Sequence, residues 1–355
     1  MTLDKPRQTL KSIHTAYPFP RRKLDKQSGE YIIKSGIAGG IAGCAAKTIV
    51  APLDRVKILF QTSNPQYSKY SGSWGGFVTA LRGIYSQDGS RGLFRGHSAT
   101  LLRIFPYAGI KFLAYEQIRH VVIPSKEYET HLRRFASGSL AGMVSVLFTY
   151  PLEVIRVRAA FETKVDKRNT LSGICKKIYA ESPRIPHPTN PNEMIALKSV
   201  PLAGLANFFR GFSATMVGMI PYAGASFLAH DTVSELLRTP AFAAKTTIPG
   251  SGGGTTNPDK PPQLKYWAEL LSGGFAGFFS QTVSYPVEVI RRRMQVGGVV
   301  GDGRRLRMVE VASQILAEKG FKGFFVGLGI GYLKIVPMAA TSFFAYERAK
   351  WYLGI

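Results

Sequence analysis

The stretch "IVAPLDRVKILFQ" (49–61) ends an apolar run that is long enough to cross a membrane. It places a proline in that run, an acid two residues later and a base three residues after the acid. The same order returns twice, as "FTYPLEVIRVRAA" (148–160) and as "VSYPVEVIRRRMQ" (283–295). Three copies of one motif predict a chain that is built from repeats.

Each repeat contains two apolar runs. A polar segment follows the run that ends at the motif, and a second run with its own proline comes next. Two helices in each of three related units predict an all-α membrane protein with six transmembrane helices in three pseudo-symmetric repeats. The second runs read "RIFPYAGIKFLAYEQIR" (103–119), "GMIPYAGASFLAHDTVS" (218–234) and "KIVPMAATSFFAYERAK" (334–350).

The repeats set the expected domain boundaries. Two further segments contain proline or glycine and have no regular spacing of apolar residues, so we expect loops or flexible linkers there. Any targeting information is expected to be internal, because the N-terminal segment has no apolar core of the signal-peptide type. The expected order is a polar lead-in at 1–30, repeat one at 31–125, repeat two at 130–238 with a loop insertion at 181–202, a linker at 239–263, and repeat three at 264–355.

The composition is strongly basic, with a formal net charge of +24 and a pI near 10.1. This charge predicts anionic partners. The mean hydropathy of +0.01 fits a soluble protein or a membrane protein with moderately polar helices. Cys44 and Cys175 are the only cysteines, so we expect no disulfide framework, no metal site and no cofactor.

Charged residues interrupt the apolar runs. Lys47 lies in the first run, and Arg103 and Lys111 lie in the second. A charge in lipid costs several kcal/mol, so these side chains should face a water-filled interior. The small-residue patterns "GIAGG" (36–40), "GSLAG" (138–142) and "GGFAG" (273–277) predict closely packed helices.

Two other classes of protein are weighed against this interpretation. A nucleic-acid-binding protein would place basic clusters with aromatics on a solvated face. Here the cations are divided among helix ends, loops and apolar runs, so we expect no nucleic-acid partner. An enzyme would need a catalytic constellation, but His97 and His230 have no repeated carboxylate or serine partner.

The acid and the base of each motif are three residues apart on a helix. They could form an ordinary surface pair worth a few tenths of a kcal/mol. Around a pseudo-threefold axis, however, each acid can meet the base of another unit. The expected ring joins Asp54 to Arg156, Glu153 to Arg291, and Glu288 to Lys57.

The pattern Pro-x-Asp/Glu-x-x-Lys/Arg, with "DGSRGLFRG" (88–96) and its counterparts downstream, resembles the mitochondrial carrier family. The resemblance covers about residues 31 to 353. It implies a monomeric six-helix carrier of the mitochondrial inner membrane, with short matrix-side helices, alternating access, both termini toward the intermembrane space, and bound cardiolipin. The ring would be the matrix gate, formed by Asp54, Lys57, Gln61, Glu153, Arg156, Glu288, Arg291 and Gln295.

The resemblance also implies a gate on the cytoplasmic side. Two ion pairs are expected there, Glu347 with Arg119 and Asp231 with Lys350, while Glu116 has no partner because Ser234 replaces a base. Ala160 departs from the glutamine expected beside the matrix gate, and Ala203 and Lys319 stand where an acid is usual. The expected cytoplasmic-gate residues are Tyr115, Glu116, Arg119, Asp231, Tyr346, Glu347 and Lys350.

Substrate contacts in the family lie three residues before the second-helix prolines. Several cations demand several negative charges, and a glycine beside an apolar residue leaves a slot for a flat ring. Tyr107 and Tyr222 could instead be packing aromatics, and Lys111 could pair with Glu116. The candidate substrate-binding residues are Lys47, Arg103, Tyr107, Lys111, Gly218, Met219, Tyr222 and Lys334.

Phosphates and an adenine would satisfy both halves of this site. Stretches such as "KILFQTSNPQYSKYSG" (57–72) and "GMIPYAGASFLAHD" (218–231) resemble the coenzyme A carriers of the family. The resemblance implies import of coenzyme A into the matrix. ADP, ATP or adenosine 3′,5′-bisphosphate remains the alternative substrate.

Overall fold

The computed structural model describes residues 28–125, 130–163, 170–181, 184–186, 194–196, 201–251, 261–299 and 305–355. Most of the lead-in at 1–30 and part of the insertion at 181–202 therefore lie outside the described residues, as do residues 252–260 of the linker.

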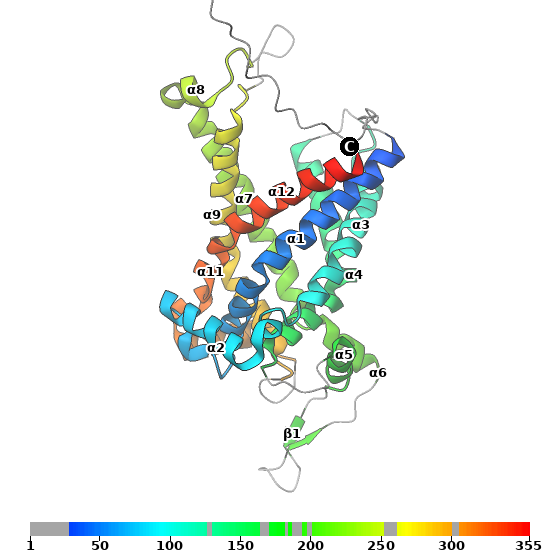
Figure 1. Ribbon diagram of the computed structural model, residues 1–355, viewed down its shortest axis with the longest axis vertical. Coiled ribbons are helices and arrows are strands. Elements are labelled where there is room, and N and C mark those ends of the chain that lie inside the picture. Colours follow the sequence, from blue (N-terminus) through cyan, green and yellow to red (C-terminus); the bar gives the residue numbers. More distant parts are fainter. Residues whose placement is uncertain are drawn as a thin grey trace, which may run out of the picture.

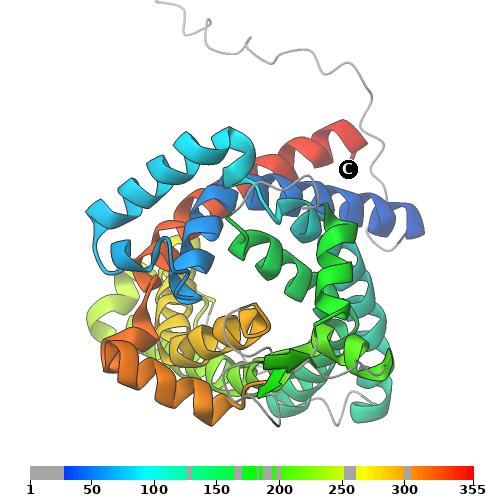
Figure 2. The ribbon, with the colours of Figure 1, turned by 90° about the horizontal axis from the view of Figure 1, so that it is seen from below.

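Long helices form a ring around a central axis (Figure 2). Over the described residues they are α1 (Gly29–Gln61), α3 (His97–Val122), α4 (His131–Phe161), α7 (Phe212–Arg238), α9 (Tyr266–Val296), and a last segment made of α11 (Leu328–Leu333) and α12 (Ile335–Leu353).

The short helices that lie within the three repeats gather at one end of the ring, which we call the short-helix end (Figures 1 and 2). The start of α1 and the end of α12 lie at the opposite end, which we call the mouth (Figure 1). The short elements of the three repeats are η1 (Ser68–Tyr70), α2 (Trp74–Leu93), α5 (Leu171–Tyr179), α6 (Pro201–Ala206), η3 (Asn207–Phe209), α10 (Met308–Lys319) and η4 (Phe321–Phe325).

Four helical stretches are long and apolar enough to cross a membrane, namely Gly29–Gln61, Arg133–Phe161, Gly204–Arg238 and Phe321–Leu353. Helices α3 and α9 complete the ring although they fall outside this set, and α3 carries Arg103, Lys111 and Glu116 along its length. The predicted all-α membrane fold is confirmed.

The two connecting segments contain more structure than the sequence predicts. Within the insertion, β1 (Arg184–Pro186) and β2 (Met194–Ala196) pair antiparallel, with Ile185 opposite Ile195. The linker begins with α8 (Pro240–Thr246), because Pro240 occupies the first helical position and alanines follow it. Arg238 Nε then donates to the Pro262 carbonyl at 3.0 Å, which fixes the far end of the linker against α7.

The tightest helix pairs join neighbouring repeats. Helix α3 packs along α4, α7 along α9, and α12 along α1. Small side chains four residues apart are buried on the first helix of each repeat, which lets the helix backbones approach. These buried stripes are Ala38, Ala42 and Ala46 on α1, Ser137, Ala141 and Ser145 on α4, and Ala268, Ser272, Ala276 and Ser280 on α9.

The predicted role of the Gly-x-x-x-Gly patterns is wrong at most positions. An added Cβ at Gly36, Gly138, Gly273 or Gly277 would meet no described atom within 4 Å. The other two positions do have a close neighbour, since an added Cβ would collide with the Phe105 ring at Gly40 and would lie 3.4 Å from Met219 Cε at Gly142. Gly36 lies two positions before the buried stripe, and Gly138, Gly273 and Gly277 each lie one position after a stripe residue, so these glycines point to another face of the helix.

The last long helix is broken at Lys334. Pro337 has no N–H to donate to the Leu333 carbonyl, and its ring would crowd that carbonyl. Helix α11 accordingly ends at Leu333 and α12 begins at Ile335. The break places a predicted substrate-binding lysine at a bend, where its side chain turns into the ring.

Candidate functional site

Three ion pairs close the ring of helices toward the short-helix end. Arg156 Nη2 lies 2.6 Å from Asp54 Oδ2, and Lys57 Nζ lies 3.0 Å from Glu288 Oε1. Arg291 Nη2 contacts Glu153 Oε1. The structure thus contains each pairing that the threefold pattern predicts, between α1, α4 and α9. We call these six residues the ion-pair ring.

The ion-pair ring depends on close backbone contacts at the start of the second helices. Gly96, just before α3, has a φ of 80°, and an added Cβ would lie 2.6 Å from the Arg156 carbonyl oxygen. Only glycine fits this left-handed position at such a distance. Gly211 and Gly327 have the same left-handed conformation ahead of α7 and α11.

Two of the three seams in the ring carry a glutamine–tyrosine hydrogen bond. Gln61 Nε2 donates to Tyr285 Oη at 3.0 Å, and Gln295 Nε2 donates to Tyr150 Oη at 3.1 Å. The repeated motif did not single out these tyrosines, although each directly precedes a motif proline.

The third seam, between α1 and α4, has alanine at both equivalent positions. Ala51 and Ala160 line a small void beside Asp54 and Arg156 there. The pair between Asp54 and Arg156 therefore lacks the support that the other two pairs have.

Additional cations bind the acids of the ring. Arg103 Nη1 lies 3.0 Å from Glu153 Oε2, and Lys334 Nζ lies 2.9 Å from Asp54 Oδ1. Arg292 Nη1 lies 3.1 Å from Glu153 Oε1 and also donates to Gln295 Oε1 at 2.9 Å. The sequence did not single out Arg292, because it lies in a run of three adjacent arginines, 291–293, which leaves open which of them face inward.

The cluster consequently has an excess of positive charge. Six cations surround three carboxylates, which gives a net charge of +3. Lys47 lines the same cavity and its Nζ lies 3.5 Å from Met338 Sδ, so it adds a further cation without a carboxylate partner among the described residues. The cavity between the ring and the mouth can therefore attract a polyanion.

An apolar cleft opens beside this cationic cavity, between α4, α7 and α9. Gly218 provides its floor, because an added Cβ there would lie 3.1 Å from Val287 Cγ1. Tyr222 is half exposed toward the cleft. Lys334 belongs to its wall, so a ligand could reach both regions at once. The cleft is also lined by Phe135, Ser139, Met143, Met219, Gln281 and Ser284.

Tyr107 and Lys111 behave differently from the other predicted contacts. The Tyr107 ring lies 5.2 Å from the Arg103 guanidinium and packs against the core near Val146, so its visible role is to position Arg103. Lys111 is exposed and forms no ion pair with Glu116 in the part of the chain that the structure describes.

The predicted cytoplasmic-gate residues lie apart near the mouth. Lys350 contacts Glu347 on its own helix at 3.6 Å and lies over the Tyr346 ring. The Asp231 carboxylate lies 3.6 Å from its neighbour His230 and forms no ion pair with Lys350 in the part of the chain that the structure describes. Glu116 and Arg119 line a surface hollow at the end of α3, and Tyr115 precedes them. The molecule is thus closed at the ion-pair ring and open at the mouth.

Ser234 departs from the expected base in a way that the structure explains. It is buried, and its Oγ lies 2.9 Å from Ser272 Oγ on α9. A long cationic side chain would not fit this tight seam between α7 and α9.

Below the ring, three arginines link the short-helix end. Arg55 donates to the Ala159 and Glu162 carbonyls, Arg158 pairs with Glu181 at 2.8 Å, and Arg293 pairs with Glu318 at 2.8 Å. The acids expected near Ala203 and Lys319 are therefore supplied by Glu181, the first residue of the insertion, and by Glu318. Burial and the nearby Arg293 guanidinium hold the pKa of Lys319 below its usual range.

The described residues contain no group of three or more His, Cys, Asp or Glu side chains that could hold a metal ion. The family model described as "Mitochondrial carrier protein" matches residues 28–126, 128–183, 194–241 and 262–354. The chain belongs to the mitochondrial carrier family. It is accordingly a transporter of the mitochondrial inner membrane and not an enzyme.

Several members of the mitochondrial carrier family are similar over nearly the whole chain. The chain is 51% identical to "Mitochondrial carrier protein LEU5" of Saccharomyces cerevisiae, covering 94% of both chains. It is 37% identical to human "Solute carrier family 25 member 16", covering 92% of this chain and 90% of the relative. It is 31% identical to "Mitochondrial coenzyme A transporter SLC25A42" of Xenopus laevis, covering 94% and 89%.

Proposed function

We propose that this carrier imports coenzyme A into the mitochondrial matrix. The observation that carries the proposal is the direct contact between a cavity of excess positive charge and an apolar cleft, with Lys334 lining both. The phosphates of coenzyme A bind Lys47, Arg103 and Lys334. Its adenine enters the cleft at Gly218 and Met219 and stacks on Tyr222. The name of the Xenopus relative supports the same substrate.

Substrate binding weakens the ion-pair ring by competition. Without substrate, Arg103 and Lys334 bind Glu153 and Asp54. A phosphate carries more charge than a carboxylate at neutral pH and draws both cations toward the cavity. The acids then keep fewer partners, and the ring of Asp54, Lys57, Glu153, Arg156, Glu288 and Arg291 can open. Gln61 and Gln295 release their tyrosines in the same step.

The two ends of the ring of helices open in alternation. The mouth faces the intermembrane space, with both termini on that side, and the short-helix end faces the matrix. When the ion-pair ring opens, the second helices converge at the mouth. Glu347 then meets Arg119, and Asp231 meets Lys350, while Tyr115, Glu116 and Tyr346 line the closed side. Because Ser234 cannot supply a third base, this closed side has one ion pair fewer.

The carrier works as a monomer and binds cardiolipin at the short-helix end. One chain supplies the ring, the cavity and the cleft. The start of α2, capped by Ser73, lies beside Gly329 of α11, where the Trp74 ring comes within 3.2 Å of the position of an added Cβ. Two helix starts side by side present backbone N–H groups to a lipid phosphate.

The test is a thermal-shift screen of the purified carrier against coenzyme A, dephospho-coenzyme A, adenosine 3′,5′-bisphosphate, ADP and ATP. A ligand at a hundredfold excess over its dissociation constant stabilises the folded state by about 2.7 kcal/mol. Coenzyme A should raise the unfolding temperature in the parent chain and not in Arg103→Ala. Uptake of labelled coenzyme A into liposomes should likewise be seen with the parent chain and lost in Arg103→Ala.

A shift with ADP or ATP as large as that with coenzyme A would overturn the narrow assignment. The protein would then be a carrier of adenine nucleotides in general. A response to none of these anions would overturn the adenine-containing substrate class altogether.

A further inference from the structure

Gln281 lies at a position of α9 whose equivalent in each of the other two repeats holds a different type of residue. It lies five residues before Pro286, as Lys47 lies before Pro52 and Val146 before Pro151. These three positions share one level of the pseudo-threefold ring. Repeat one places a cation there and repeat two an apolar side chain. Repeat three alone offers an uncharged group that can both donate and accept hydrogen bonds.

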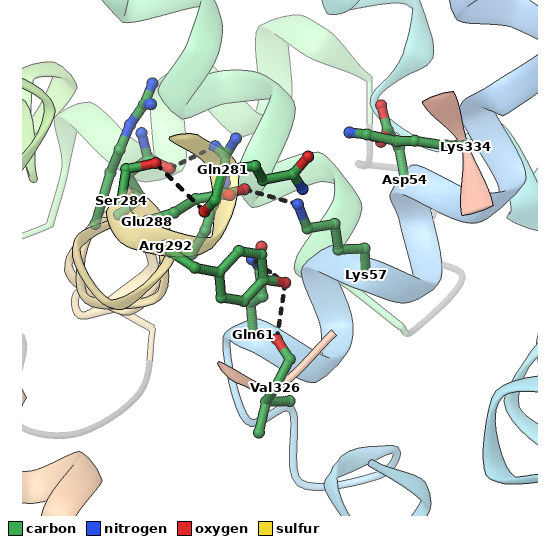
Figure 3. Close-up of polar contacts among 12 residues, drawn as sticks. Asp54, Lys57, Gln61, Gln281, Ser284, Glu288, Arg292, Val326 and Lys334 are labelled. Atoms are coloured by element: carbon green, nitrogen blue, oxygen red, sulfur yellow. Dashed lines mark hydrogen bonds and ion pairs between the residues drawn. The ribbon is translucent and has the colours of Figure 1, made fainter. Parts of the chain in front are cut away.

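The Gln281 amide is set deep in the ring by a matched glycine. Gly331 of α11 is buried, and an added Cβ there would collide with Gln281 Nε2. The equivalent positions in the other repeats, three residues before Arg103 and Gly218, are Thr100 and Thr215. Repeat three therefore lacks the Cβ that would displace the amide. Figure 3 shows Gln281 beside the Lys57–Glu288 pair.

The amide retains its hydrogen-bonding capacity. Among the described residues, the side chain of Gln281 makes no hydrogen bond, although its backbone carbonyl accepts one from Ser284. It lines the same cleft as Gly218, Tyr222 and Lys334. A polar group held at the floor of an apolar cleft fixes the orientation of a ligand and gives specificity.

We propose that Gln281 reads the nucleobase of the substrate. Its amide accepts a hydrogen bond from the 6-amino group of adenine and donates one to the adjacent ring nitrogen, which is the pairing that amide side chains make with adenine. Gly331 is the positioning residue, because its missing side chain leaves room for the Gln281 amide. This inference rests on the proposed function, because the cleft must receive the base of an adenine-containing anion.

The experiment is a double-mutant cycle on binding. It measures dissociation constants by titration calorimetry for coenzyme A and for the analogue with unsubstituted purine in place of adenine. In the parent chain, loss of the 6-amino group should weaken binding about 5- to 10-fold, as expected for one hydrogen bond to a buried partner. In Gln281→Leu the two ligands should bind equally. Gly331→Ala should reduce the difference as well, because it displaces the amide without removing it.

Gln66→Leu is the matched control, since Gln66 is an exposed amide outside the cavity and should leave the 5- to 10-fold ratio intact. An unchanged ratio in Gln281→Leu would overturn the role of Gln281 and leave coenzyme A binding in place. Absence of coenzyme A binding to the parent chain would overturn the proposed function, and this inference with it. The two failures are therefore distinguishable.

Discussion

Lys334 Nζ lies 2.9 Å from Asp54 Oδ1, so a side chain aimed at the substrate cavity is held by an acid of the ion-pair ring. The same relation joins Arg103 to Glu153 across the cavity. In both cases the acid also binds a base of the ring, Arg156 or Arg291. The substrate-facing cations can leave without stranding a buried carboxylate, which distinguishes their roles from those of the ring bases.

Replacing Lys334 by Gln should therefore separate transport from stability. Asp54 keeps Arg156, so we expect the free energy of unfolding without substrate to fall by less than the roughly 3–5 kcal/mol that removing one partner of a buried pair costs when the other is left unpaired. Transport of coenzyme A into liposomes should fall at least tenfold. The comparison variant is Arg156→Gln, which removes a ring base. A loss of stability in Lys334→Gln as large as in Arg156→Gln would contradict the distinction.

Glu153 is the most heavily paired acid in the ring. It is 2% exposed and binds Arg291, Arg292 and Arg103. Glu153→Gln leaves three inward cations without their carboxylate, and such a change costs about 3–5 kcal/mol in buried pairs. Thermal unfolding in detergent measures this loss. Asp231→Asn is the control, because its carboxylate is 71% exposed and its loss should cost less than about 0.5 kcal/mol.

The seam between α1 and α4 should respond to an added glutamine. Ala160→Gln places an amide in the void beside Asp54 and Arg156, where it can hydrogen-bond to the pair. One such bond contributes about 1 kcal/mol. We expect a higher unfolding temperature and slower transport, because the ring becomes harder to open. The reverse substitution at another seam, Gln295→Ala, should lower the unfolding temperature. Faster transport in Ala160→Gln would show that this seam does not limit opening.

Gly96 should tolerate no side chain. Its φ of 80° and the 2.6 Å from an added Cβ to the Arg156 carbonyl make Gly96→Ala strained in two ways. We expect a loss of about 1–3 kcal/mol, from the left-handed strain alone, and a shift of Arg156 away from Asp54. Gly109→Ala on α3 is the matched control, since open space surrounds its Cβ position. Equal unfolding temperatures for the two variants would refute the close contact.

The sequence predicts the ion-pair ring well, because the threefold repetition supplies the geometry. Because Pro52, Pro151 and Pro286 are equivalent around a pseudo-threefold axis, the acid of each motif faces the base of another motif. Each of the three expected ion pairs is present. The substrate and gate roles of these residues remain predictions. The helix content and the family also follow from the repeated motifs.

Contacts that break the threefold symmetry could not be predicted in this way. The contact between Gln281 and Gly331 joins two segments that are far apart along the chain, and nothing local in either segment indicates the other. The Gly-x-x-x-Gly patterns were misleading for a related reason. Periodicity shows which residues share a helix face, but the neighbouring helix decides which face is covered, and here it covers the Ala and Ser stripe.

The three tight helix pairs have a consequence for biosynthesis. Each pair joins the second helix of one repeat to the first helix of the next, and the last pair joins α12 to α1. Helices α1 and α12 are the first and the last long helices of the chain, so the packed face of α1 is covered only when α12 has also entered the membrane. A chain that stops before residue 335 therefore leaves that face of α1 without its helix partner.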